Sequence, residues 1–157
     1  MTKFEKTFYL EASLRGLAKW LRFVGLKVEI TKNKITHRDI LQHKDKFFLI
    51  TSYETAKILD KYHIDYLIVP RDNLKTQLKF FFNYFNLTPK LSLDICSLCG
   101  EPLISVKKED FKEKIPPKVW EKYNSYNYCP KCDKLYWEGD HVQRLKKKFK
   151  ELLNTSL

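Results

Sequence analysis

The sequence predicts an α/β domain with a parallel sheet, followed by a smaller cysteine-containing module that ends in a helix. Up to about Leu87, short apolar runs alternate with segments of helical periodicity, a pattern typical of βαβ units. After Pro89 the chain becomes rich in Cys, Lys, Pro and Tyr, and its periodicity is weak. We therefore expect two domains, residues 1–90 and residues 91–157.

The first domain contains four predicted strands and four predicted helices in alternation. The strands are the apolar runs Phe8–Leu10, Val28–Ile30, Phe47–Ile50 and Tyr66–Val69. The helices are Ala12–Val24, Thr36–His43, Glu54–Tyr62 and Asn73 to about Phe85. Gly25 stands where the first helix needs a C-cap. Thr36 with Asp39, and Thr51 with Glu54, have the spacing of helix capping boxes.

The second domain carries two Cys-x-x-Cys pairs, Cys96 with Cys99 and Cys129 with Cys132. Each spacing lets one tight turn present two sulfurs, and two such turns form a tetrahedral four-sulfur site that suits zinc. The 29 residues between the pairs can be an insertion, since loop-closure entropy grows slowly with length. Two disulfides or free core thiols are the alternatives. We expect one structural zinc ion, because four thiolates leave no open coordination position.

The net charge of +11, from 30 Lys and Arg against 19 Asp and Glu, favours an anionic partner. Nucleic acid, an acidic protein and a membrane surface all fit, as does a merely lysine-rich surface. No apolar run approaches the ~20 residues of a membrane span, and the N-terminus lacks the apolar stretch of a signal peptide. We therefore predict a cytoplasmic protein with reduced thiols and no membrane partner. A basic helix, Asp140–Leu153, is expected at the end of the chain.

Three acidic residues follow the predicted strands: Glu11, Glu54 and Asp72. In open parallel sheets, ligands bind beyond the carboxyl ends of the strands. Carboxylates that converge there could bind Mg²⁺ or Mn²⁺ and support attack on a phosphodiester. Each acid also has a purely structural interpretation. Glu54 fits the capping box, Asp72 fits the N-cap of the next helix or the residue before it, and Glu11 lies near a helix start.

Basic residues surround these acids in the sequence. Arg15, Lys19 and Arg22 share one face of the first helix, and Arg71 and Lys75 flank the start of the fourth. They could hold a phosphate backbone, or they could simply be solvated. The aromatic residues of the cysteine-containing module could stack on bases, although a role as the core of that module is the favoured interpretation. These residues are Tyr126, Tyr128, Tyr136 and Trp137.

Four segments resemble, in order, the Mut-seven C-terminal RNase domain family. They are LRGLAKWLRFVG after a strand-end acid, a strand that ends in LITS, the segment DNLKTQL, and Cys-x-x-Cys followed by CPKCDKLYWEGDH. The resemblance runs from about Phe8 to Leu145. It implies a PIN-like, three-layer α/β domain followed by a zinc ribbon, with a ribonuclease activity that depends on Mg²⁺ or Mn²⁺.

By position, Glu11 stands where this family usually has Asp, Asp72 matches an acid of the family, and Arg15 and Arg22 match basic positions. The family usually has Thr-Arg-Asp where this chain has Thr51–Ser52–Tyr53, so one acid is absent and Glu54 is its neighbour. We predict a metal-dependent ribonuclease acting on RNA, in particular single-stranded RNA. The alternatives are a non-catalytic RNA-binding protein on the same fold and a protein-interaction domain, for which the sequence names no protein partner.

Overall fold

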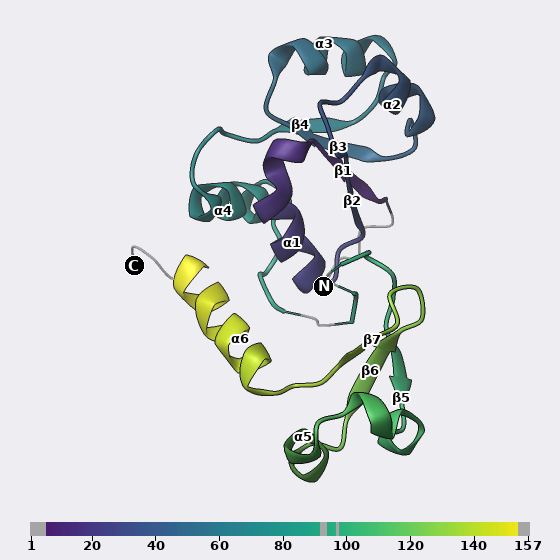
Figure 1. Ribbon diagram of the computed structural model, residues 1–157. Coiled ribbons are helices and arrows are strands. Elements are labelled where there is room, and N and C mark those ends of the chain that lie inside the picture. The colour runs from purple at the N-terminus through teal and green to yellow at the C-terminus, as the bar shows by residue number, and fades with distance from the viewer. Residues whose placement is uncertain (1–5, 92–93, 97, 154–157) are drawn as a thin grey trace. The chain divides into compact units, whose positions relative to one another are not determined.

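The computed structural model describes residues 6–91, 94–96 and 98–153 (Figure 1). The chain divides into two compact units, Met1–Leu93 and Asp94–Leu157. The first unit is an α/β domain with a parallel sheet, as predicted. The second contains a small antiparallel sheet and the four cysteines.

All eight predicted elements of the first unit form, and apart from the start of the first helix their ends differ from the prediction by at most one residue. The strands are β1 (Phe8–Leu10), β2 (Val28–Ile30), β3 (Phe47–Ile50) and β4 (Tyr66–Ile68). The helices are α1 (Arg15–Phe23), α2 (His37–Gln42), α3 (Tyr53–Lys61) and α4 (Leu74–Tyr84). The start of the first predicted helix is a separate 3-10 turn, η1 (Ala12–Leu14), so α1 begins later than expected.

The four strands are parallel and lie in the order β2-β1-β3-β4. The chain therefore moves from β1 to one side of the sheet, returns, and continues on the other side. The winding direction reverses between β1 and β3, and in sheets of this kind a crevice forms outside the carboxyl ends of the strands at that point.

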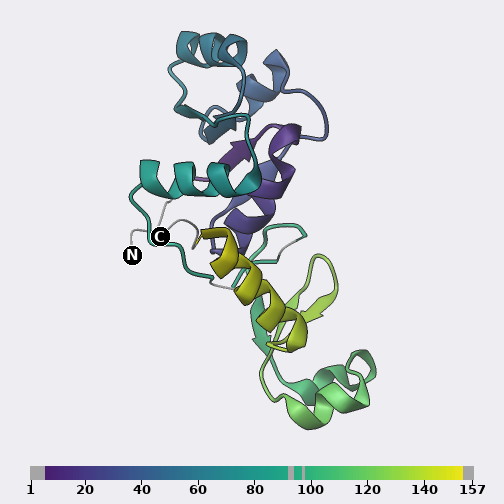
Figure 2. The ribbon, with the colours of Figure 1, turned by 90° about the vertical axis from the view of Figure 1, so that its left-hand side faces the viewer.

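Alternate residues of the strands point to opposite faces of the sheet, and each face is covered by helices (Figures 1 and 2). On one face, Tyr9, Phe48 and Ile50 join Ile40 of α2 and Leu59 of α3 in one buried cluster. The other face carries a group of aromatic rings from β1, β3 and the α4 region. In that group the Phe8 ring lies 5.5 Å from Phe47, 5.3 Å from Phe81 and 5.5 Å from Phe85. Helices on both faces give the three layers that the resemblance implied.

Local signals explain how α2 begins and how α1 ends. Thr36 and Asp39 form the predicted capping box at the start of α2. Gly25 follows α1 with a φ of 91°, a left-handed conformation that glycine adopts without a steric penalty.

The predicted capping box of Thr51 and Glu54 does not form. Ser52 caps α3 instead, because its side chain accepts a hydrogen bond from the Thr55 N–H at 3.4 Å. The Thr51 hydroxyl donates to the carboxylate of Glu11, which is distant in sequence. The Thr51 side chain, which the local pattern assigned to the helix cap, therefore forms a tertiary contact instead.

The second unit contains a three-stranded antiparallel sheet with strand order β5-β6-β7. Its elements are β5 (Ile104–Val106), η2 (Lys108–Lys114), α5 (Pro117–Lys122), β6 (Tyr126–Cys129), β7 (Lys134–Tyr136) and α6 (Asp140–Leu153). The insertion between the cysteine pairs thus contributes secondary structure of its own. Tyr126 is 2% exposed and packs with Ile115 and Leu135, which confirms the core role expected for this aromatic residue. No helix among the described residues is long and apolar enough to cross a membrane.

We expect Phe8→Ala to lower the free energy of unfolding of the first unit by about 3–5 kcal/mol, because it removes a fully buried ring that contacts three others. Urea unfolding followed by circular dichroism measures this change. Leu41→Ala is the control, since Leu41 is 42% exposed and its truncation should change stability by only about 0.5 kcal/mol. Equal effects of the two substitutions would contradict the assignment of the core.

Candidate functional site

The four cysteines of the second unit come together in a geometry that suits zinc. Their sulfur atoms all lie within 4.8 Å of one another. The distance from Cys96 Sγ to Cys132 Sγ is 3.9 Å, and that from Cys99 Sγ to Cys129 Sγ is 3.5 Å. Tetrahedral zinc with Zn–S bonds of about 2.3 Å places its sulfurs about 3.8 Å apart. The cluster that the Cys-x-x-Cys spacing predicted is therefore present.

Tight backbone turns position the sulfurs. At the first pair, the Gly100 N–H donates to the Cys96 carbonyl at 2.9 Å, and Gly100 has a φ of 79°. At the second pair, the Cys132 N–H donates to Cys129 Sγ at 3.4 Å. All four cysteines are free thiols, and the sulfur separations far exceed the ~2.05 Å of a disulfide. This arrangement favours a metal site over the disulfide alternative.

Tyr136 supports this cluster from outside the ligand set. Its hydroxyl oxygen lies 3.1 Å from Cys96 Sγ. Burial opposes ionisation of Cys96, but hydrogen bonds from Tyr136 and from backbone N–H groups outweigh it and lower the pKa of the thiol to about 6. A hydrogen bond that stabilises the thiolate also prepares the sulfur for a cation, since the thiolate is the metal-binding form.

We expect the purified protein to contain about one zinc per chain, and Tyr136→Phe to weaken zinc binding by about 10-fold. Elemental analysis gives the stoichiometry, and competition with a chromogenic chelator gives the affinity. Tyr123→Phe is the control, because Tyr123 packs in the core of the second unit and no hydrogen bond joins its hydroxyl to the four cysteines. Equal zinc affinity of the Tyr136 variant and the parent would show that this hydroxyl does not support the metal site.

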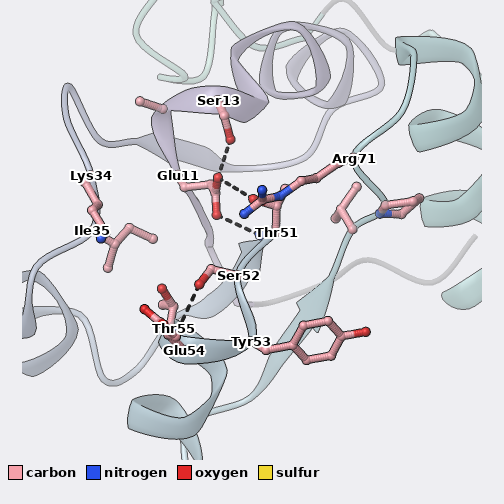
Figure 3. A pocket seen from close by; sticks show the side chains of 13 residues that line it. Glu11, Ser13, Lys34, Ile35, Thr51, Ser52, Tyr53, Glu54, Thr55 and Arg71 are labelled. Carbon is pink, nitrogen blue, oxygen red and sulfur yellow. Dashed lines mark hydrogen bonds between the residues drawn. The ribbon is translucent and has the colours of Figure 1, made fainter.

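A pocket of about 870 Å³ lies at the carboxyl edge of the parallel sheet (Figure 3). Residues that follow each of the four strands line it. They include Glu11 after β1, Lys34 after β2, Thr51, Tyr53 and Glu54 after β3, and Arg71 after β4. The pocket therefore occupies the place where parallel sheets of this winding bind ligands.

Glu11 joins β1 to β3 at the centre of this pocket (Figure 3). Its Oε1 accepts the Thr51 N–H at 2.7 Å, and its Oε2 accepts the Thr51 hydroxyl at 2.8 Å. The Ser13 hydroxyl also donates to Oε2. In the backbone, the Glu11 N–H donates to the Leu49 carbonyl at 3.3 Å and continues the ladder between the two strands. The carboxylate thus has a structural task at the end of the sheet in addition to any chemical one.

Asp72 lies beside a second, smaller pocket of about 490 Å³, which Glu11 and Arg71 also line. Its Oδ1 accepts the Asn73 N–H at 2.7 Å. Asn73 is the N-cap of α4 and accepts the Thr76 N–H at 2.9 Å, so Asp72 is the residue just before the cap. The sequence allowed Asp72 to be either the N-cap of this helix or the residue before the N-cap. In the structure it is the residue before the N-cap.

Glu54 is exposed and lines only the larger of these two pockets. Figure 3 shows Glu54 and Tyr53 leaving the start of α3 on opposite sides. Among the described residues, the four cysteines are the only group of three or more His, Cys, Asp or Glu whose ligand atoms lie within 4.8 Å of one another. The three predicted acids therefore share one edge of the sheet without forming such a cluster.

The smaller pocket nevertheless has the donor chemistry of a Mg²⁺ or Mn²⁺ site. Magnesium usually keeps several waters and takes only one or two carboxylates from the protein. Glu11 and Asp72 supply two carboxylates, and Thr51, Ser13 and Gln77 line the same pocket with further oxygens. These oxygen ligands fit an Mg²⁺ or Mn²⁺ ion that takes two carboxylates from the protein. Glu54 does not line this pocket.

The predicted basic residues separate into three groups. Arg71 lines both pockets, and its side chain forms no hydrogen bond or ion pair with the residues that the structure describes. Arg22 instead donates from Nε and Nη2 to the Val28 carbonyl, at 3.1 and 2.7 Å, and so ties α1 to β2. The remaining three line neither pocket: Arg15 and Lys19 are exposed on α1, and Lys75 is half-buried on α4.

Several residues that line the two pockets were not among the site residues predicted from the sequence. Lys34 follows β2 at the same edge of the sheet, a position that could have identified it. Thr51 and Ser13 bind Glu11, and nothing in the local sequence indicates that contact. Tyr53 lines the larger pocket as an exposed aromatic side chain.

The parallel sheet with a carboxylate-containing pocket at its carboxyl edge, followed by a four-cysteine module, defines a two-part α/β protein of the kind that the resemblance implied. The family model of the Mut7-C RNAse domain matches residues 6–149. The chain therefore belongs to the Mut7-C RNase domain family. No curated protein and no solved structure matches the sequence at a significant level.

Proposed function

We propose that this chain is a metal-dependent ribonuclease that hydrolyses phosphodiester bonds of RNA at the carboxyl edge of its parallel sheet. The observation that carries the proposal is the pairing of Glu11 and Asp72 with Arg71 around one pocket. Membership of an RNase domain family supports RNA as the substrate. The net charge of +11 supports a polyanionic substrate as well.

In this proposal Glu11 and Asp72 hold one Mg²⁺ or Mn²⁺ ion. When bound, the ion would neutralise negative charge that builds up on the phosphodiester during hydrolysis. Arg71 and Lys34 bind phosphate oxygens and set the position of the backbone. Glu54 adds a third carboxylate on the larger pocket, within the space that the substrate would enter.

The proposed substrate is single-stranded RNA, because a flexible strand can bring its backbone into a concave pocket between loops. Arg15, Lys19 and Lys75 would extend the contact with the backbone beyond the pocket. Arg22 belongs to this proposed basic surface only in part, since its guanidinium already binds Val28. We place the activity in the cytoplasm, where thiols stay reduced and one zinc ion can keep the second unit folded.

A non-catalytic RNA-binding protein is the second candidate. The observation in its favour is the carboxylate of Glu11, which is already occupied by three hydrogen bonds from Thr51 and Ser13. A carboxylate with that purely structural task would hold the pocket in shape, and Arg71 and Lys34 would still bind phosphate. This candidate predicts RNA binding that weakens with salt, without turnover.

Cleavage of a labelled single-stranded RNA with Mn²⁺ or Mg²⁺ separates the two candidates. We expect cleavage that requires the added ion and that falls about 100-fold or more in Asp72→Ala. The ion should be omitted rather than chelated, because a chelator would also compete for the zinc of the cysteine cluster.

Asp65→Ala is the matched control for this assay, because Asp65 is an exposed carboxylate that precedes β4 and lies at the opposite edge of the sheet. It should cut RNA like the parent. RNA that is bound but never cut, with the same affinity in Asp72→Ala, would replace the ribonuclease by the binding protein. Cleavage that persists in Asp72→Ala would exclude this pocket as the active site.

A further inference from the structure

Tyr53 combines high exposure with a position on the larger pocket. Among the described residues, the exposed large hydrophobic side chains reach from 37% to 74% exposure, and Tyr53 has the highest value. Single exposed aromatic residues are common on protein surfaces and need no special explanation. Tyr53 differs because it lines the same cavity as Glu11, Lys34 and Arg71.

The ring of Tyr53 is available to a ligand. Tyr53 is the first residue of α3, directly after the Ser52 cap, so the hydrogen bonds of the helix start hold its backbone in place. Within the described part of the chain, the side chain forms no hydrogen bond and the ring contacts no other ring. Figure 3 shows the ring extending away from Glu11 and from Glu54. The start of α3 therefore presents a largely exposed ring.

The other residues of the pocket that Tyr53 lines match the two parts of a nucleotide. Arg71 and Lys34 offer cations for a phosphate, and both lack partners among the described residues. Val69 and Pro70 add apolar surface to the same pocket. A cavity of about 870 Å³ has room for a phosphate and the base attached to the same nucleotide.

We propose that Tyr53 is a stacking platform for an unpaired nucleobase whose neighbouring phosphate is bound at Arg71. This inference rests on the proposed function, which it deepens by assigning a base subsite. Stacking on an aromatic ring works for any base, since every base has a π-face. A base in a duplex would first have to leave its stack, which costs energy. The subsite therefore selects single strands and tolerates many sequences.

The test is the binding of short 2′-O-methyl oligonucleotides, which keep phosphates and bases but resist cleavage, to the full chain. One oligonucleotide carries bases throughout, and a second of the same length carries abasic positions at its centre. We expect Tyr53→Ala to bind the base-containing strand about 5- to 100-fold more weakly than the parent, and the abasic strand equally well. Tyr53→Phe should stay within about twofold of the parent on both strands, because its ring still stacks.

Tyr84→Ala is the matched control, since Tyr84 is 57% exposed on α4 and lines neither pocket. It should bind both strands like the parent. Unchanged binding of the base-containing strand by Tyr53→Ala would overturn the base subsite and leave the proposed function standing. Equal losses on both strands would also overturn it, because the ring would then act on the backbone. Failure of the parent to bind either strand would overturn the subsite and the proposed function together.

Discussion

The connection between Glu11 and Thr51 is the interaction on which the candidate site depends. The carboxylate of Glu11 accepts both the N–H and the hydroxyl of Thr51, and so it fastens the end of β1 to the end of β3. These two strands flank the point at which the winding of the sheet reverses. Within the described part of the chain, these hydrogen bonds join the segment that follows β1 to the segment that follows β3.

Helix caps and strand pairing place the remaining parts of the pocket. Ser52 follows Thr51 and caps α3, which fixes where Tyr53 and Glu54 leave the helix. On the other side, β4 pairs with β3, and the turn after it carries Arg71 and Asp72 to the same edge. Each residue of the site therefore takes its position from the order of the strands and from the caps of the helices that follow them.

The sequence predicted the fold well, because the signals for its elements are local. The strand Phe47–Ile50 is a continuous apolar run, and Thr36 and Asp39 form the capping box that their spacing predicts. The cysteine cluster could also be predicted from the sequence, because two cysteines separated by two residues can present both sulfurs from one tight turn. The placement of Glu11 and Asp72 on one pocket follows from their positions after parallel strands.

Long-range contacts account for what the sequence could not predict. Thr51 has the spacing of a helix cap, yet a carboxylate 40 residues away binds its hydroxyl. Arg22 lies on the basic face of its helix, yet its guanidinium binds a strand carbonyl. In both cases the partner belongs to or follows a different strand, so no pattern within one segment reveals it.

In the proposed function, Glu11 both fastens the sheet edge and takes part in RNA hydrolysis. The most direct measurement is the unfolding free energy and the RNA cleavage rate of Glu11→Gln, taken on the same preparation. Glutamine keeps the shape and still accepts the Thr51 N–H, so we expect stability to fall by only about 1 kcal/mol and cleavage by about 100-fold or more. A folded Glu11→Gln protein that cuts RNA at the rate of the parent would show that this carboxylate takes no part in the hydrolysis.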